Sequence, residues 1–399
     1  MRRRILLTCY AIEAGKGSES GSGYNFARRV AGEGFDLTLI TRRNNAERLR
    51  LDSAFEGVTI VGYDPSPFLT FWKRKSRGVI PYYYIWQVGV GRIARRLHEE
   101  SRFDVLHNYN FHTDWAPHFL RAKDATVVWG PICHQPRVPT SFLRLELVRG
   151  SVREWSKAAT KQLFWTADPA LRRAIKSTSV IIYANEDVAR PFASARGKIR
   201  FESFGGASFA PHSQAKPEGP LRLLHVGRTV SIKGGQVAVD GFAAAVSRGS
   251  KAQLTFVGDG PLRHRLERYV QARGLTNVVS CIPRVRHEEM ESIYHAADAL
   301  LYPSLGNQDT VVAEALAAGL PVICLAGSGT SGMAGPAGLA VPRGPYRRIV
   351  EQLASRILEV ERAKAEGRLD GLRQAARARA RLISWDGTVR RIVRAYGAR

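Results

Sequence analysis

The chain is predicted to fold as an α/β protein with two doubly wound domains, each built on a parallel sheet. Three observations support this fold class. Short apolar runs typical of strands alternate with helical patterns along most of the 399 residues. A chain of this length favours two domains of ordinary size. The polar, proline-containing segment 211–220 interrupts the alternation and is the best linker candidate.

The first half is predicted to form a domain over residues 1–210. The apolar run at its start follows a basic N-terminus, but we interpret it as a buried strand and not as a signal peptide, because no cleavage context follows. Between the strands lie helical patterns, such as the segment 23–34, where Phe26 and Val30 fall on one helix face. The strand candidates are residues 5–10, 36–41, 58–63, 104–109, 126–130 and 179–185.

The alternation restarts after the linker and predicts a second domain over residues 221–383. No stretch approaches the roughly 18 consecutive apolar residues of a membrane-spanning helix, so none is expected. The strand candidates here are residues 221–227, 252–258, 278–283, 299–304, 321–326 and 338–341.

The charge balance favours an anionic partner. Lys and Arg number 60 against 35 Asp and Glu, a net charge of +25, and such a field attracts polyanions. An anionic membrane face, a merely solvated basic surface and nucleic acid all remain open, although no zinc-finger spacing or RNP-like motif is present and nucleic acid is not expected. The four cysteines lie far apart and are interpreted as buried free thiols in a reducing compartment.

The most informative segment begins where the first strand of the second half ends. There Gly227 and Arg228 lead through Lys233 into a helical pattern, and the next strand ends at Gly258 in an Asp-Gly-Pro turn. Backbone N–H groups at a helix N-terminus and two nearby cations suit a diphosphate. The alternative interpretation is a surface arginine and lysine, which are common in so basic a chain.

Three motifs occur in order in the second half: GRTVSIKGG at 227–235, FVGDGP at 256–261 and PSLGNQDTVVAEALAAGLPV at 303–322. Together they resemble glycosyltransferase family 4. This resemblance implies the GT-B architecture, in which two Rossmann-like domains face a cleft and a last helix, here 384–399, crosses back onto the first domain. It also implies nucleotide-sugar donors, retention of configuration and no metal or other cofactor.

The same resemblance assigns donor-binding roles in the second domain. Glu314 would bind the ribose hydroxyls, because a carboxylate accepts two hydrogen bonds from a vicinal diol; otherwise it is a glutamate near a helix N-terminus. Arg228 and Lys233 would act catalytically by stabilising the departing diphosphate. Gly227 and Gly258 would allow close approach of the donor, and the loop residues Asn307, Asp309 and Thr310 would hold a phosphate through backbone amides.

One position departs from the family pattern. The usual second acid lies eight residues before the helix glutamate, where this chain has Gly306; counting forward from Pro303 gives Asn307, and neither is acidic. Asp309 is the only carboxylate inside the loop. The departure leaves the identity of the sugar and full catalytic competence open.

Candidate residues also occur in the first half. Gly21 and Gly23 lie in the segment 14–26, predicted to be a loop, where glycine would let the backbone approach the donor; it lacks the third glycine of the dinucleotide fingerprint and resembles a loop of a family 4 subset. His112, between a strand and a helix, is the preferred catalytic histidine; a structural role is the alternative.

Two further residues of the first half are assigned to the acceptor side. His107 is one candidate, although it could be buried in its strand. Trp129 lies in a segment similar to a family loop that faces the acceptor; it would stack on a sugar ring or belong to the core. No HExxH motif or clustered Asp/His spacing indicates a metal site.

The sequence thus predicts a retaining glycosyltransferase that uses a UDP- or GDP-sugar and a saccharide or polyprenyl-linked saccharide acceptor in cell-surface polysaccharide synthesis. We expect it in the cytoplasm, at the inner membrane face, where the segment 142–176 either lies on anionic lipid or packs as an ordinary amphipathic helix. Rival hypotheses are a donor-binding but non-catalytic partner of another transferase, a sugar-nucleotide epimerase of the same fold, and a basic nucleic-acid-binding protein.

Overall fold

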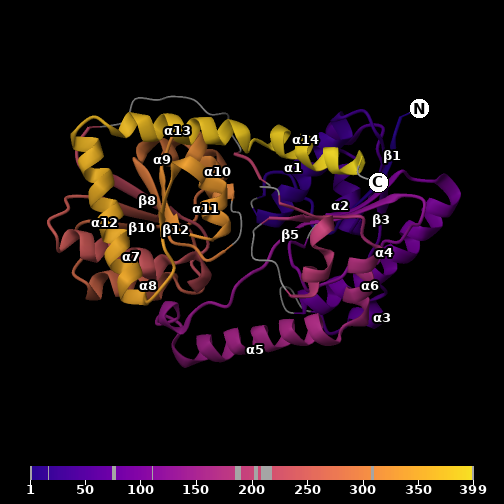
Figure 1. The fold of residues 1–399 in the computed structure, drawn as a ribbon, viewed down its shortest axis with the longest axis horizontal. Helices are drawn as coiled ribbons and strands as arrows, with labels where there is room; N and C mark the ends of the chain where they lie inside the picture. The colour runs from indigo at the N-terminus through magenta and orange to yellow at the C-terminus, as the bar shows by residue number, and fades with distance from the viewer. Residues whose placement is uncertain are drawn as a thin grey trace. The chain divides into compact units, whose positions relative to one another are not determined.

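The computed structural model describes residues 2–16, 18–73, 78–109, 111–184, 190–201, 205–207, 218–306 and 310–397. The chain divides into two compact units (Figure 1). The first unit comprises Met1–His134, Ala159–Phe204 and Trp385–Arg399, and the second comprises Gln135–Ala158 and Gly205–Ser384. Residues 135–158 were predicted to belong to the first domain, but they group with the second unit. Most of the predicted linker lies outside the described residues.

The first unit contains a seven-stranded sheet in the order β3-β2-β1-β4-β5-β6-β7, and all its pairings are parallel. Six strands coincide with predicted ones within one or two residues; the three-residue β7 was not predicted. The strands are β1 (Arg4–Cys9), β2 (Asp36–Thr41), β3 (Thr59–Gly62), β4 (Val105–Tyr109), β5 (Thr126–Ile132), β6 (Val180–Tyr183) and β7 (Ile199–Phe201).

Helices lie between most of these strands in the chain, as expected for parallel neighbours. Between β4 and β5 the described residues 111–125 form no helix. The core between sheet and helices includes Phe26, whose ring stacks on Tyr109 with centroids 4.3 Å apart. The helices are α1 (Ser18–Gly32), α2 (Arg43–Leu49), α3 (Pro67–Thr70), α4 (Val79–Ser101), α6 (Pro169–Ser177) and α14 (Trp385–Arg394), with the short 3₁₀ helices η1 (Ser53–Phe55), η3 (Arg190–Lys198) and η6 (Ala395–Gly397).

The second unit contains a six-stranded sheet in the order β10-β9-β8-β11-β12-β13, again with parallel pairings throughout. All six strands were predicted. They are β8 (Arg222–Val226), β9 (Gln253–Val257), β10 (Val279–Ile282), β11 (Ala299–Tyr302), β12 (Val322–Leu325) and β13 (Gly338–Val341). The predicted fold class is therefore confirmed.

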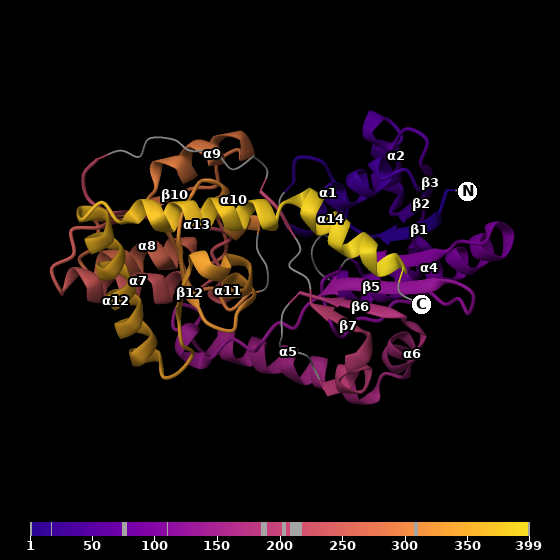
Figure 2. The ribbon, with the colours of Figure 1, turned by 45° about the horizontal axis from the view of Figure 1, so that its top comes forward.

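Helices cover both faces of this sheet (Figure 2). Successive residues of β8 point to opposite faces: Leu223 joins one core cluster and Leu224 the other. The helices are α7 (Gly235–Val246), α8 (Arg263–Ala272), α9 (His287–Ala296), α10 (Thr310–Ala317), α11 (Gly329–Ala334), α12 (Tyr346–Ala365) and α13 (Leu369–Leu382), with the short 3₁₀ helices η4 (Ser231–Lys233) and η5 (Gly335–Ala337).

The 135–158 segment packs on the core of the second unit. It contains η2 (Thr140–Phe142) and the first part of α5 (Leu147–Ala167). Val138, Phe142 and Leu143 are buried in the same core cluster as Leu223. This packing could not be predicted from the sequence, because the segment follows β5 of the first unit directly.

Both sheets have a topological switch point, where the strand order reverses. In the first sheet it lies between β1 and β4, and in the second between β8 and β11. In open doubly wound sheets, ligands bind outside the carboxyl ends of the strands at such a point. The loops that follow β8 and β11 are therefore the first place to look for a site in the second unit.

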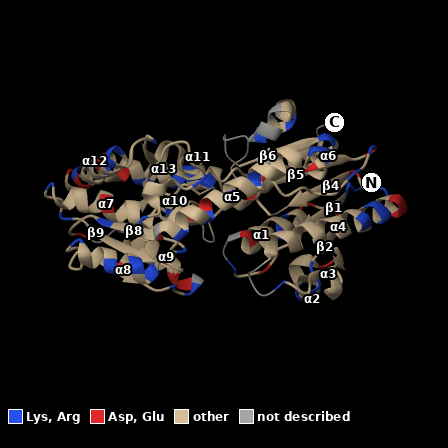
Figure 3. Cartoon of the chain, turned by 90° about the horizontal axis from the view of Figure 1, so that it is seen from below, with Lys and Arg blue, Asp and Glu red and all other residues tan. Residues whose placement is uncertain are grey.

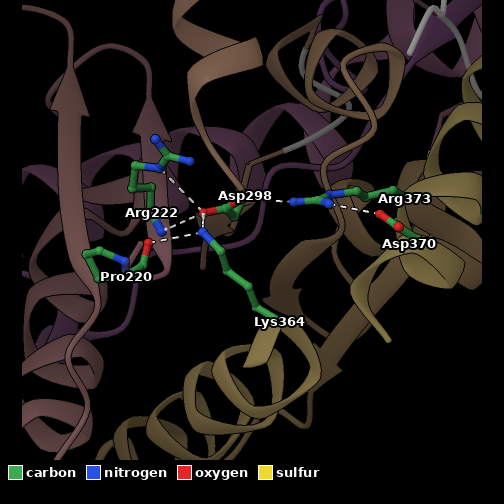
Figure 4. Close-up of polar contacts among 6 residues, drawn as sticks. All are labelled: Pro220, Arg222, Asp298, Lys364, Asp370 and Arg373. Atoms are coloured by element: carbon green, nitrogen blue, oxygen red, sulfur yellow. Dashed lines mark hydrogen bonds and ion pairs between the residues drawn. The ribbon is translucent and has the colours of Figure 1, made fainter. Parts of the chain in front are cut away.

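At the amino ends of β8 and β11, away from the loops of the switch point, a buried carboxylate holds two helices of the second unit in place (Figure 4). Asp298 is fully buried beside the start of β11. It accepts hydrogen bonds from the backbone N–H of Arg222 at 3.0 Å, from Lys364 of α12 at 2.7 Å and from Arg373 of α13 at 3.0 Å. Because a buried charge requires partners, this cluster fixes α12 and α13 to the sheet.

Candidate functional site

The loop after β8 begins at Gly227, which has a φ of 142°. Its N–H donates to Val257 O at 3.0 Å. Gly258, which follows β9, lies close to Gly227: a Cβ atom added to Gly258 would be 2.2 Å from Gly227 O. Glycine is therefore required at Gly258, and the loops after β8 and β9 form one packed backbone layer.

The loop after β8 is also fixed to the loop after β11. A Cβ atom on Gly234 would lie 2.3 Å from Pro303 O, and the N–H of Leu305 donates to Ile232 O at 2.9 Å. These contacts fix the turn that ends at Lys233. The structure thus joins two of the three sequence motifs at the switch point between β8 and β11.

The two predicted phosphate cations both lie on this loop. Arg228 is exposed, and Lys233 is half-buried with its Nζ atom 5.8 Å from the centroid of the Tyr302 ring. Helix α7 begins directly after them at Gly235, and its N-cap, Gly234, provides no side-chain cap. Two cations beside the N-terminus of a twelve-residue helix create a positive potential suited to a phosphate group.

Glu314 is nearly buried on α10, the helix that follows the β11 loop. The hydroxyl of Tyr294, on α9, donates to its Oε2 atom at 3.0 Å. This bond fixes the orientation of the carboxylate. Thr310, predicted to hold a phosphate, is the first residue of α10. Asn307 and Asp309, predicted for the same role, lie outside the described residues.

A pocket lies beside the β8 loop. Its lining includes both predicted cations, His225 and Gly258, together with Phe142 and Leu145 of the 135–158 segment. The amide of Leu145 donates to Oε1 of Gln236 in the first turn of α7 at 3.3 Å. The segment therefore forms one wall of the pocket, a position that was not predicted from the sequence.

In the first unit, Gly21 and Gly23 lie inside α1 and not in a loop, so the predicted extent of that loop is wrong. The helix begins at Ser18. A Cβ atom on Gly21 would lie 1.8 Å from Lys16 O, which explains the glycine by a close approach of the chain itself. The predicted approach of these two glycines to the donor remains untested.

His112 follows β4 at the switch point of the first sheet and is almost buried. The described residues 111–125 that lie between β4 and β5 contain no helix, so the helix predicted after His112 is wrong. Its backbone N–H donates to Oε1 of Glu19 at 3.2 Å. Burial lowers the pKa of His112 to about 3, so its ring is neutral at physiological pH. Burial raises the pKa of Glu19 to about 7, although the N–H of His112 opposes the shift. Glu19 was not among the predicted site residues; its only signal was its place in the segment 14–26.

His107 and Trp129 belong to the core of the first unit, so their predicted acceptor-side positions are not supported. The ring of His107 is fully buried. Its Nδ1 atom lies 2.7 Å from Tyr396 Oη, and its Nε2 atom lies 2.7 Å from Gly130 O. Trp129 is buried on β5, with its ring centroid 5.5 Å from that of Phe192. Neither ring is accessible to a sugar.

Comparison with known proteins gives likenesses to glycosyltransferases. Residues 220–361 match the family model described as "Glycosyl transferases group 1". The chain is 27% identical over 156 residues to the putative colanic acid biosynthesis glycosyltransferase WcaL of Escherichia coli, covering 37% of this chain and 38% of that relative. It is 24% identical over 335 residues to the D-inositol 3-phosphate glycosyltransferase of Arthrobacter sp., covering 79% of this chain and 76% of the relative.

Solved structures share the whole fold. A glycosyltransferase from Rickettsia africae has a TM-score of 0.64 at 13% identity, with 99% of this chain and 98% of that chain covered. Anabaena Alr3699/HepE in complex with UDP has a TM-score of 0.60 at 14% identity, with 98% of each chain covered. Residues 220–361 thus match a group 1 glycosyltransferase domain, and the two-unit α/β fold is shared with solved glycosyltransferases. These likenesses support a glycosyltransferase.

Proposed function

We propose that the protein is a retaining glycosyltransferase of family 4 that transfers a sugar from a UDP- or GDP-sugar to a saccharide or lipid-linked saccharide in cell-surface polysaccharide synthesis. The observation that carries this proposal is the meeting of the β8 and β11 loops, which fixes Lys233 at the N-terminus of α7. Glu314 follows on the next helix with its carboxylate oriented by Tyr294.

The chemistry of glycosyl transfer suits these groups. As the bond from the anomeric carbon to the diphosphate breaks, negative charge grows on the leaving group and positive charge on the sugar. Arg228, Lys233 and the dipole of α7 then stabilise the transition state more than the ground state. Loss of one such contact typically raises the barrier by about 3–4 kcal/mol. His112, neutral and at the carboxyl edge of the first sheet, is proposed as the catalytic histidine.

A nucleotide donor is supported by one structural neighbour in particular. Anabaena Alr3699/HepE has been solved with UDP and with UDP-glucose. We propose no metal for this reaction, since the two cations and the helix dipole supply the charge for the diphosphate. We therefore expect full activity in excess EDTA. Loss of activity that Mg²⁺ or Mn²⁺ restores would overturn the proposal of a metal-independent reaction.

The first test is thermal stabilisation by UDP and by GDP in the wild type, in Glu314→Ala and in a control, Glu351→Ala. Glu351 pairs with Arg347 on the surface of α12. A ligand that binds the folded state raises the melting temperature. We expect a shift with one nucleotide that Glu351→Ala keeps and Glu314→Ala loses. No shift with either nucleotide in the wild type would overturn the donor site.

A non-catalytic, donor-binding role is the second candidate, because the usual loop acid is absent. In its place Gly306 is buried and its N–H donates to Ser304 Oγ at 3.0 Å. Hydrolysis of UDP- or GDP-sugars, measured as the release of nucleotide, distinguishes a catalytic protein from a non-catalytic, donor-binding one. Slow release of nucleotide without acceptor supports catalysis, whereas tight donor binding with no turnover on any saccharide acceptor supports the second candidate.

We also propose that the protein contacts an anionic membrane through α5. Four of its apolar side chains recur on one face of the helix. Val148, Val152, Trp155 and Leu163 are 77%, 63%, 60% and 62% exposed. The helix carries four cations against one acid, Glu154. The Arg137 guanidinium lies 4.1 Å from the Trp155 ring centroid.

An exposed apolar face bordered by cations is typical of helices that lie on anionic lipid. Lys and Arg also lie on other helices of both units (Figure 3), so charge alone does not select α5. Across the described residues, no helix is long and apolar enough to cross a membrane.

Vesicle flotation tests the lipid contact. Binding to vesicles containing phosphatidylglycerol is expected to be lost in Trp155→Glu and kept in Leu382→Glu, a matched change at an apolar residue of α13 that is 63% exposed. Equal binding by both variants would contradict the role of α5.

A further inference from the structure

His225 is a buried side chain whose polarity the packing does not explain. It lies on β8, two residues before Gly227, and is 5% exposed. Neither ring nitrogen has a hydrogen-bond partner among the described residues. Most buried polar side chains have partners, because an unmade hydrogen bond leaves the cost of desolvation uncompensated. An unpaired histidine in a packed strand therefore indicates a missing partner.

The ring lies beside the proposed diphosphate site. It packs between Phe256 and Tyr302, with ring centroids 4.9 and 5.2 Å away. Its Nε2 atom is 3.8 Å from the point where a Cβ atom on Gly235 would lie, and Gly235 is the first residue of α7. The ring also lines the same pocket as the two cations of the β8 loop.

The charge state of His225 fits a neutral donor. Burial, with a further contribution from Lys233, lowers the pKa of the ring to about 3. At physiological pH the ring is therefore neutral, with one N–H group to donate and one nitrogen to accept. A phosphoryl oxygen accepts hydrogen bonds only, so it can pair with this N–H, as it can with the backbone N–H groups at the start of α7.

We propose that His225 is a positioning residue of the anion site, which donates a ring N–H to a phosphoryl oxygen bound at the N-terminus of α7. This inference rests on the proposed function, because the expected phosphoryl group is the diphosphate of the nucleotide-sugar donor. A hydrogen bond to a charged phosphate is among the stronger ones in proteins. His225 was not among the predicted site residues, because the sequence offered only a histidine within an apolar run.

The test is calorimetric binding of UDP, GDP and the matching nucleosides to wild type, His225→Leu and His225→Gln. We expect His225→Leu to weaken binding of the preferred nucleotide about tenfold or more. It should leave binding of the nucleoside unchanged, and His225→Gln, whose amide can donate, should recover part of the loss. Inorganic phosphate, titrated alone, shows whether the site takes a free anion or only the nucleotide.

A second readout separates a functional role from a structural one. Without ligand, His225→Leu should melt at the same temperature as wild type or higher, since it removes an unpaired polar group from an apolar site. If His225 served stability instead, His225→Leu would melt at a lower temperature than wild type. In wild type labelled with ¹⁵N-histidine, the nucleotide should also raise the pKa of His225, because the phosphate favours the protonated ring.

Equal nucleotide affinity in wild type and His225→Leu would overturn the inference and leave the donor site standing. If His225→Leu does not fold, an unchanged ring signal on nucleotide addition to the wild type would overturn it in the same way. Failure of the wild type to bind UDP or GDP would overturn both the proposed function and the inference.

Discussion

The hydroxyl of Ser231 lies 2.5 Å from Oε1 of Glu146. Ser231 opens the turn that ends at Lys233, and Glu146 immediately precedes α5. Arg153 forms an ion pair with the second oxygen of this buried carboxylate. The 135–158 segment therefore holds the loop that carries a proposed phosphate cation.

Removing this carboxylate should affect both stability and nucleotide binding. In Glu146→Ala the Ser231 hydroxyl and Arg153 lose their shared partner, at a cost of about 1–3 kcal/mol in the free energy of unfolding. We expect the affinity for the preferred nucleotide to fall severalfold, because the loop is no longer held. Calorimetry and urea denaturation measure the two effects. Glu359→Ala, which breaks an exposed pair with Arg356, is the control and should change neither.

The hydrogen bond from Tyr294 to Glu314 should tune nucleotide affinity. Tyr294→Phe leaves the buried carboxylate without the donor that orients it, so we expect a loss of about 1 kcal/mol in binding free energy. The control is Tyr269→Phe, which removes a similar bond, 2.7 Å long, to Asp240 away from the site. A double-mutant cycle with Glu314→Gln should show coupling for Tyr294 and none for Tyr269.

Gly258 should tolerate no side chain. Gly258→Ala combines a φ of 140° with a Cβ atom 2.2 Å from Gly227 O, so both strain and a backbone clash arise. Gly249→Ala is the matched control, because Gly249 also has a positive φ, of 92°, but no atom within 4 Å of the added methyl group. We expect about 1 kcal/mol of destabilisation at Gly249 and clearly more at Gly258, with loss of nucleotide binding only at the latter. Similar unfolding curves for both variants would contradict the close approach.

The Asp298 cluster should matter for stability and not for binding. Asp298→Ala leaves Lys364 and Arg373 without their buried partner, and we expect a loss of about 3–5 kcal/mol in the free energy of unfolding. Asp370→Asn removes only an exposed carboxylate that pairs with Arg373 and should cost less than about 0.5 kcal/mol. Urea denaturation checks both values. Because the cluster lies at the ends of the strands away from the β8 loop, folded Asp298→Ala should keep the nucleotide affinity of the wild type.

Glu19 should make stability depend on pH near neutrality. Its pKa is raised from 4.5 to about 7 in the folded state, so the folded state favours the protonated carboxyl. The contribution of Glu19 to the free energy of unfolding is complete below about pH 4.5 and is lost as the pH rises through about 7. Glu19→Gln, which imitates the protonated form, should be more stable than wild type at pH 8 by on the order of 1 kcal/mol. This value is modest because a third of the Glu19 side chain is exposed. Melting curves between pH 5 and 8 measure this, and parallel curves for wild type and Glu19→Gln would contradict it.

The fold could be read from the sequence because parallel strands buried on both faces leave long apolar runs. The β8 and β11 loops could be found because their glycines and cations are local patterns. Burial that depends on distant residues could not be read in this way. His107 contacts Tyr396, and Glu146 contacts Ser231, so their roles are fixed by packing across large sequence separations. The start of α1 was missed because several glycines in one stretch favour a loop, whereas here Gly21 permits a close backbone approach.

The division of the chain also affects how such proteins can be recombined. Each unit is assembled from separate stretches, since Gln135–Ala158 packs with the second unit and Trp385–Arg399 with the first. A chimera that exchanges the nucleotide-binding half by a single cut at residues 211–220 would therefore leave behind the segment that supplies Glu146. A successful exchange must transplant residues 135–158 with the second unit and keep the original C-terminal helix with the first.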